Sequence, residues 1–244
     1  GLEYNSNRGL LNGHEYVEVA GLRWATENLA ITESGKRIFK GNRQTTTGVG
    51  LNTGHVIGDI FQWAATDVNY TSFSSKCVYG DSENSFNFKP DCDFTHAHSP
   101  FYDPSSSLKP YFYPNTGDHG YAYGSKKILI PGDDAATVNW GEPWRIPGIT
   151  DQSQNPANDS EFKALREATV AVWDQYQGHY IFLPVNEADK GTRLRELTTT
   201  YTKANAILFF PSVGFAENSG FSYPGDFGCY WTNCVRSGDR QYAY

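Results

Sequence analysis

The sequence predicts a single α+β domain, residues 1–244, with short antiparallel strands, one or two helices and long ordered loops. Aromatic residues make up 15% of the 244 residues, and large rings favour β-structure. The chain also holds 24 glycines and 12 prolines without a repeating period, which indicates many turns. Runs of strand candidates accompany one strongly helical stretch, and this segregation is typical of α+β proteins rather than of parallel α/β proteins.

Residues 14–30 are the first predicted element and have the pattern of a hairpin. Val17 and Val19 precede an Ala-Gly pair at 20–21, and Leu22 and Trp24 continue the alternation beyond it. Alternation with a period of two is the signature of a strand with one buried face. We therefore expect two strands joined by a turn at that pair.

The segment from Asn69 to Tyr123 shows no hydrophobic period and mixes Ser, Asn, Asp and Pro with many aromatic residues. Irregular stretches of this length are uncommon in compact domains and are usually functional or disordered. Disordered chains contain few aromatic residues. We therefore expect an ordered insertion at about 69–123 that its rings tie down.

Several rings of this insertion are candidates for ligand binding. Exposed aromatic side chains can stack on sugars or anchor a protein partner, and the alternative is that they only pack the loop itself. The candidates are Tyr102, Tyr111, Phe112, Tyr113, Tyr121 and Tyr123.

Residues 132–147 contain two tryptophans, two prolines and an acidic pair, a composition that regular helices and strands avoid. The oxygen-bearing side chains of this stretch could ligate Ca²⁺, which takes about six to eight oxygen ligands. The alternative is that the acidic pair caps a turn and that Arg145 pairs with a carboxylate, since Asp favours turns. The candidate metal ligands are Asp133, Asp134, Asn139 and Glu142.

The strongest helical signal covers residues 159–173. Asn158 is a candidate N-cap with Glu161 three residues later, as in a capping box, and Asp159 adds negative charge at the positive end of the helix dipole. Apolar residues then recur at helical spacing and predict one buried face. That face comprises Phe162, Leu165, Thr169, Val172 and Trp173.

Short strand candidates follow the helix, and each is rich in aromatic or aliphatic residues. They cover residues 180–183, 206–210, 230–232 and 241–244. Pro184 and Pro211 are expected to end the first two, because proline cannot continue a central hydrogen-bond ladder.

Four cysteines occur as two local pairs, Cys77/Cys92 and Cys229/Cys234. Neither pair has the Cys-x-x-Cys spacing of a zinc site, whereas each could close a loop as a disulfide. Free buried thiols are the other interpretation. We expect two disulfides and no cofactor apart from the Ca²⁺ considered above.

The formal net charge of −7 and the lack of a basic run argue against a nucleic-acid or anionic-membrane partner. No stretch reaches the roughly 20 apolar residues of a transmembrane helix, and no signal-peptide pattern follows Gly1. We therefore expect a soluble, processed chain whose signal or anchor lay upstream.

Short motifs recur along most of the chain in a fixed order. They are Trp24-Ala25-Thr26-Glu27-Asn28-Leu29, Gly58-Asp59-Ile60-Phe61-Gln62-Trp63, the Asp-Asp-Ala-Ala-x-x-x-Trp-Gly-x-x-Trp-Arg-x-Pro stretch at 133–147, and Tyr230-Trp231-Thr232. Together they closely resemble the Fibrobacter-type major paralogous domain (FISUMP), a family of secreted or surface modules with a C-type-lectin-like fold. The insertion at 69–123 is longer than is usual in that family.

The resemblance implies a non-catalytic cell-surface module for recognition or adhesion, with a glycan or a surface protein as its partner. By analogy it also implies a fimbrial or other outer-surface assembly of a Gram-negative anaerobe. Two alternatives stay open. Formylglycine-generating enzymes have a similar fold and use reactive cysteines, for which Cys229 and Cys234 are the candidates here. The other alternative is a purely structural surface subunit.

Overall fold

The computed structural model describes parts of the chain that belong to two compact units. One unit takes its described residues from 1–59 and 165–229, and the other from 60–69, 93–164 and 230–244. Among the described residues, sheets occur together with two helices, so the predicted α+β class is confirmed, while the expected count of one domain stays a prediction. The described residues are 8–33, 35–36, 38–39, 54–61, 65–68, 129–148, 160–174, 177–217, 220–222 and 227–233.

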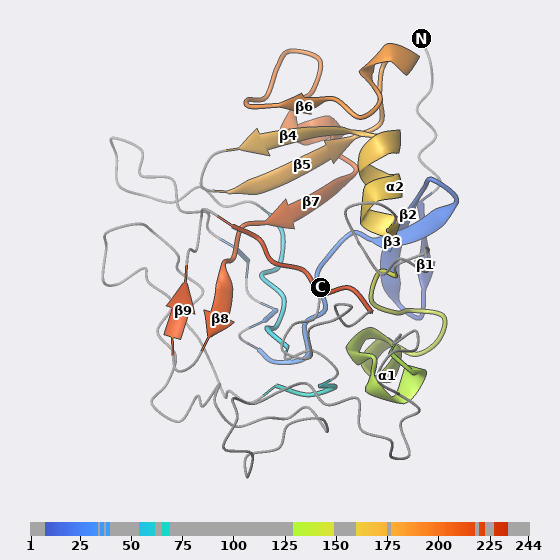
Figure 1. Ribbon diagram of the computed structural model, residues 1–244, viewed down its shortest axis with the longest axis vertical. Coiled ribbons are helices and arrows are strands. Elements are labelled where there is room, and N and C mark those ends of the chain that lie inside the picture. The colour runs from blue at the N-terminus through green and yellow to red at the C-terminus, as the bar shows by residue number, and fades with distance from the viewer. Residues whose placement is uncertain are drawn as a thin grey trace, which may run out of the picture. The chain divides into compact units, whose positions relative to one another are not determined.

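The N-terminal strands of the first unit form a three-stranded antiparallel sheet (Figure 1). β1 (Arg8–Leu11) pairs with β2 (His14–Val19), and β2 pairs with β3 (Leu22–Ala25). Ala20 and Gly21 make the turn between β2 and β3, both with positive φ. The predicted hairpin is confirmed, whereas β1 is an additional strand whose Arg-Gly-Leu-Leu sequence has no alternation.

A second sheet of the same unit has the strand order β6-β4-β5-β7 (Figure 1). β4, β5 and β7 are antiparallel neighbours, and β6 runs parallel to β4. The bounds are β4 (Val170–Asp174), β5 (Gly178–Phe182), β6 (Arg193–Leu194) and β7 (Leu208–Pro211). The unit also contains the pair β8 (Phe215–Glu217) and β9 (Gly220–Ser222) and the 3-10 turns η2 (Glu187–Asp189) and η3 (Lys203–Asn205).

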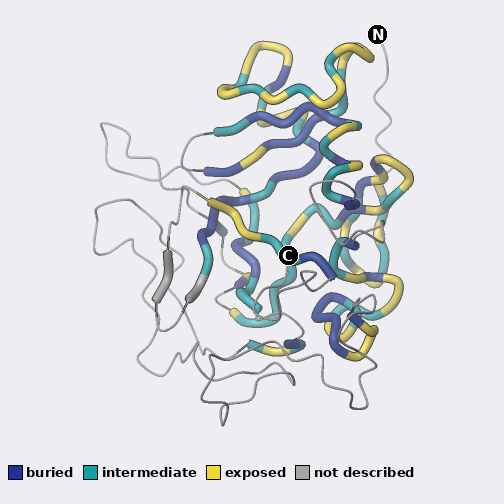
Figure 2. The backbone as a smooth tube through the Cα atoms, viewed as in Figure 1, coloured by how far each residue is buried: buried dark blue, intermediate teal, exposed yellow. Residues whose placement is uncertain are grey.

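One face of the four-stranded sheet carries deeply buried side chains. Val170 and Val172 on β4, Tyr180 and Phe182 on β5 and Phe209 on β7 are all at most 5% exposed. Figure 2 shows long dark blue stretches in these strands. Full burial of a large apolar side chain stabilises a fold by about 1.5–3 kcal/mol, so this face contributes strongly to the stability of the unit.

The predicted helix over residues 159–173 is wrong in its second half. α2 spans only Glu161–Ala168, and the chain enters β4 two residues later. The change from helix to strand occurs at Thr169, whose hydroxyl donates to the Leu165 carbonyl oxygen at 2.6 Å. The β-branched Val170 then starts an extended run that pairs with β5, so pairing within the sheet overrides the helical spacing of the sequence.

The start of α2 also differs from the predicted capping box. The hydroxyl of Ser160 accepts the N–H of Lys163 at 3.0 Å, as an N-cap side chain does. Glu161 occupies the first helical position and not the third, so its carboxylate takes no part in a capping box and can bond to another segment. Asn158 lies outside the described residues.

The strand predictions after the helix hold in part. Residues 180–183 overlap β5, and residues 206–210 overlap β7, which ends at Pro211 as expected. Residues 230–232 are not a strand, and the chain next to them bonds to irregular segments instead, since Asn233 N–H donates to the Pro147 carbonyl oxygen at 3.0 Å. The candidate at 241–244 lies outside the described residues.

The second unit contains the 3-10 turn η1 (Pro131–Asp133) and the short helix α1 (Ala135–Trp140). The expectation that residues 132–147 avoid regular structure is therefore wrong for α1. The side chain of Asp134 caps the start of this helix, and Gly141, with φ of 79°, follows its last residue. Isolated helices of this length are unstable, so the cap and the surrounding contacts hold it.

Gly178 tests the pairing of β5 with β7. Its φ is 146°, and a Cβ atom there would overlap the carbonyl oxygen of Phe210. We expect Gly178→Ala to lower the free energy of unfolding by about 2 kcal/mol or more, measured by urea denaturation. Gly132→Ala is the matched control, because a Cβ at Gly132 meets no atom within 4 Å. Equal stability of the two variants would contradict the described register.

Candidate functional site

Asp134 lies at the start of α1 and uses both carboxylate oxygens on backbone donors. Oδ1 accepts the N–H groups of Ala136 at 2.9 Å and Thr137 at 3.0 Å, and Oδ2 accepts that of Ile146 at 2.9 Å. The residue is only 3% exposed. Burial raises the pKa of Asp134 above its ordinary value, and the three backbone N–H groups oppose that rise. The carboxylate thus joins the beginning of α1 to the returning chain.

The other three candidate metal ligands have different surroundings. Asn139 donates its side-chain amide to the carbonyl oxygens of Ala135 and Thr66, both at 2.8 Å. Asp133 is buried, whereas Glu142 is exposed. Within the described ranges, no group of three His, Cys, Asp or Glu side chains is placed to share a metal ion.

A calcium ion fits this arrangement poorly. The oxygens of Asp134 would have to give up three backbone bonds to become ligands, which would leave the N–H groups of α1 and Ile146 without their acceptor. The structure therefore confirms the capping interpretation for Asp134. Calcium binding stays an untested prediction.

Arg145 pairs with Glu161, as the capping interpretation of the sequence also expected. Nη1 donates to Oε2 at 2.7 Å and Nη2 donates to Oε1, which makes a bidentate pair. The N–H of Gly148 donates to Oε2 as well. Burial alone would raise the pKa of Glu161, but the bonds from Arg145 and Gly148 outweigh it and hold that pKa below its ordinary value. The carboxylate is therefore ionised at neutral pH and fixed in place.

Backbone hydrogen bonds also hold the chain near the Arg145–Glu161 ion pair. Glu161 N–H donates to the Gly148 carbonyl oxygen at 2.9 Å, and Leu129 N–H donates to that of Asn233 at 2.7 Å. A Cβ atom at Gly148 would lie 3.3 Å from side-chain atoms of Arg145, Glu161 and Asn233. Glycine is therefore the residue that lets the two charged side chains approach the backbone here.

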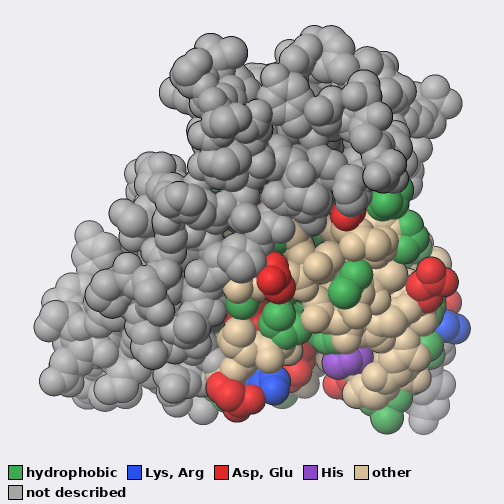
Figure 3. Space-filling model, turned by 90° about the horizontal axis from the view of Figure 1, so that it is seen from below, with side chains coloured by type: hydrophobic (Ala, Val, Ile, Leu, Met, Phe, Trp, Pro, Cys, Tyr) green, Lys and Arg blue, Asp and Glu red, His purple; other side chains and the backbone are tan. Residues whose placement is uncertain are grey.

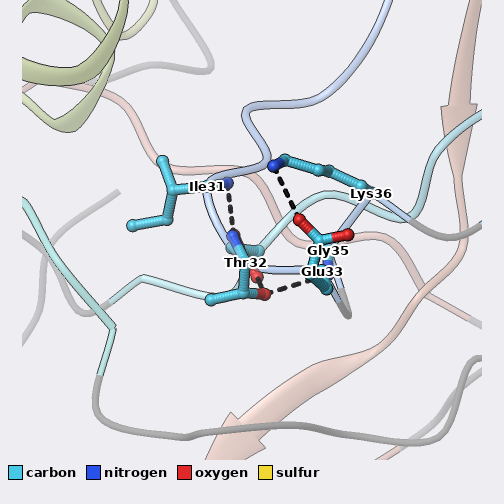
Figure 4. A network of polar contacts seen from close by, with 6 residues as sticks. Ile31, Thr32, Glu33, Gly35 and Lys36 are labelled. Atoms are coloured by element: carbon cyan, nitrogen blue, oxygen red, sulfur yellow. Dashed lines mark hydrogen bonds and ion pairs between the residues drawn. The ribbon is translucent and has the colours of Figure 1, made fainter.

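Asp59 holds a turn in place, although it is not among the candidate site residues predicted from the sequence. Its carboxylate accepts the N–H groups of Ile31 at 2.6 Å and Thr32 at 2.7 Å, together with the Thr32 hydroxyl. The Thr32 oxygen in turn accepts the N–H of Gly35 at 3.0 Å, and Figure 4 shows this turn from close by. The signal was the Gly-Asp pair at 58–59 of the second family-like motif, but nothing in the sequence shows which segment that Asp would hold.

The described tryptophans of the motifs are partly or fully buried, whereas Trp63 lies outside the described residues. Trp24 and Trp144 are less than 10% exposed. Trp140 packs against Trp144 at a centroid distance of 5.4 Å, and the indole N–H of Trp231 donates to the Phe61 carbonyl oxygen at 2.7 Å. The six candidate ligand-binding rings between Tyr102 and Tyr123 lie outside the described residues.

Cys229 is an exposed, free thiol, and desolvation of its sulfur raises the pKa of the thiol. A raised pKa lowers the fraction of thiolate, which is the nucleophilic form. Cys77, Cys92 and Cys234 lie outside the described residues, so the Cys77–Cys92 disulfide stays a prediction, whereas Cys229 forms no disulfide in this structure.

On the face that Figure 3 draws, the described acidic side chains do not form one patch. Figure 3 shows acidic side chains at several separate places on one face, with few basic ones among them. No described helix is long and apolar enough to cross a bilayer.

Comparison of the chain with protein-family models, with curated proteins and with solved structures finds no significant match. The resemblance to the FISUMP family and its C-type-lectin-like fold therefore stays a prediction from the motifs.

Glu161 gives the loop a pH dependence with a defined sign. Because its pKa is lowered on folding, its contribution to stability is fully present above the ordinary Glu value of about 4.3 and is lost as the pH falls through the lower folded value. We expect Glu161→Gln to cost about 2 kcal/mol of unfolding free energy at pH 7, a figure kept small because Arg145 is partly exposed. The difference between wild type and variant should shrink as the pH falls from 6 to 3. A difference that is constant with pH would contradict the ionised pair.

Replacement of Asp134 separates capping from calcium binding. We expect Asp134→Ala to cost about 2 kcal/mol, because α1 loses its cap and Ile146 N–H loses its acceptor. Asp134→Asn should cost less, since an amide oxygen can still accept from α1. Neither Ca²⁺ nor a chelator should change the melting temperature of any of the three proteins. A Ca²⁺-dependent rise in wild type that both variants lack would establish a metal site instead.

Proposed function

We propose that this chain is a non-catalytic recognition or adhesion module of the cell surface, with a C-type-lectin-like scaffold of the FISUMP type. The observation that carries the proposal is the use of three acidic groups, two within the motifs and one at the start of α2. Asp59, Asp134 and Glu161 all bind backbone N–H groups and so fix loops. Their role is structural, which leaves the aromatic insertion at 69–123 as the part of the sequence best suited to bind a ligand.

The composition of that insertion supports a glycan or a protein surface as the ligand. Tyrosine combines a flat apolar ring with a hydroxyl group, so it can stack on a sugar and also exchange hydrogen bonds. Tyr111, Phe112 and Tyr113 are three consecutive rings in this insertion. Loops carried by a fixed scaffold are also where binding residues are usually found.

The proposed cell-surface localisation rests on the resemblance of the motifs to the FISUMP family. A secreted or surface module, in a fimbrial or other outer-surface assembly, agrees with the family resemblance and with the acidic net charge of −7. The enzyme alternative is less well supported, because the pKa of Cys229 is raised rather than lowered. Titration of free thiols in denaturant counts them, and the pH dependence of alkylation of the native chain then tests that alternative, since a low-pKa reactive thiol would favour it.

A glycan array probed with the whole chain tests ligand class and metal dependence together. We expect binding that is the same with Ca²⁺ and with chelator, because Asp134 is occupied by backbone donors. The variant Tyr111→Ala/Phe112→Ala/Tyr113→Ala should lose at least about tenfold in affinity, since each stacked ring contributes on the order of 1 kcal/mol or more.

Phe221→Ala is the matched control, because it removes one ring outside the insertion. Binding that requires Ca²⁺ and disappears in Asp134→Asn would move the site to the acidic motif. A blank array would reject the glycan ligand for the sugars tested and favour a protein partner or a structural subunit.

A further inference from the structure

The face of the four-stranded sheet opposite Val172 and Tyr180 carries a row of rings. Trp173 on β4 pairs in register with His179 on β5, and His179 pairs with Phe210 on β7. Directly paired residues of antiparallel strands project to the same side of a sheet. The rings of Trp173 and His179 are in contact, with centroids 4.8 Å apart and planes tilted by 48°. The backbone ladder therefore fixes this pair.

Exposure changes along that face. Ala171, Ile181 and Leu208 also project to it, and each is at most 8% exposed, so this end is covered. Trp173 is only partly buried and His179 is exposed. The covered face thus reaches solvent at the Trp173–His179 pair.

Arg193 adds a positive charge on the neighbouring strand of the same face. It is exposed and lies on β6, where it pairs in register with Ala171 of β4, one step along the same face from Trp173. The pKa of His179 is lowered by desolvation and further by the charge of Arg193, which places the guanidinium within electrostatic reach of the imidazole. His179 is therefore neutral at pH 7 and can both donate and accept a hydrogen bond.

We propose that Trp173, His179 and Arg193 form a shallow binding site for a sugar ring that bears a carboxylate. The indole offers an apolar surface to the C–H face of the ring, and the tilted imidazole offers a hydrogen-bonding partner to its hydroxyl groups. The guanidinium matches the planar carboxylate, which it binds with two N–H donors. This combination selects an acidic sugar over a neutral one.

The site goes beyond the proposed role of residues 69–123 and does not depend on it. All three residues stand on paired strands, so their backbone does not have to be ordered on binding. The contact is a single sugar ring on an open surface, for which weak binding is expected. The test must therefore detect millimolar-range binding, which corresponds to about −4 kcal/mol.

Amide and indole NMR spectra of the whole chain provide that test. The indole N–H signal of Trp173 is assigned as the one missing in Trp173→Phe. Galacturonate, N-acetylneuraminate and neutral galactose are titrated separately, which distinguishes the two kinds of acidic sugar from each other and from a neutral ring. We expect the Trp173 signal to shift with at least one acidic sugar and at least about tenfold more weakly with galactose, as loss of a charge-assisted pair predicts.

Arg193→Gln should weaken that binding at least about tenfold while the fold is kept, because Arg193 is exposed. Arg195→Gln is the matched control, since Arg195 is exposed and lies just beyond β6. Equal loss of binding in both variants would show that general positive charge, and not Arg193 itself, attracts the sugar. Binding of galactose as strong as that of the acidic sugars would reject an acidic sugar as the specific ligand. No shift of the Trp173 signal with any sugar would overturn the site. The Tyr111→Ala/Phe112→Ala/Tyr113→Ala variant should bind the acidic sugar as wild type does, so failure here is distinguishable from failure of the insertion as a ligand site.

Discussion

Carboxylates that accept backbone N–H groups hold the irregular segments of this protein in place. Asp59 holds the turn that begins at Ile31, Asp134 joins α1 to Ile146, and Glu161 holds the loop at Gly148. A carboxylate taken out of water stays charged only where donors replace its hydration. Each of these groups therefore favours one backbone arrangement, since a loop that moved away would leave carboxylate oxygens without their donors. This requirement gives definite geometry to segments that no helix or strand fixes.

The four-stranded sheet depends instead on backbone hydrogen bonds at and next to Thr169. The carbonyl oxygen of Thr169 accepts the N–H of Gly191, and Ala171 N–H donates to the carbonyl oxygen of Thr192. These bonds bring the chain after η2 alongside the start of β4, so that β6 runs parallel to it. The same register that buries Val170 and Val172 on one face turns Trp173 to the other. Core packing and the placement of the proposed sugar site thus follow from one pairing.

Local patterns in the sequence predict the β2–β3 hairpin, β5 and β7, because alternation and proline positions are encoded within a few residues. The helix over 159–173 is half wrong, since Val172 and Trp173 fit helical spacing and strand pairing equally well, and only the partner strand decides. The capping alternative for Asp134 follows from the tendency of Asp to cap turns and is confirmed, whereas no local pattern identifies Glu161 as the partner of Arg145. The role of Asp59 could not be predicted, because its donors lie 27 and 28 residues away in the chain.

The buried carboxylates and the exposed Arg193 of this protein differ in whether they can still bind a ligand. Glu161 and Asp134 are surrounded by donors, so a ligand would have to break those bonds before it gained any from them. Arg193 is exposed on a paired strand, so a carboxylate that bound it would mainly replace water. A single contact of this kind is weak, but an acidic polysaccharide repeats the same ring many times along one chain. Rebinding to neighbouring rings and simultaneous contact through a second site both raise the effective affinity without any deeper pocket, which agrees with the proposed role in adhesion to an extended surface.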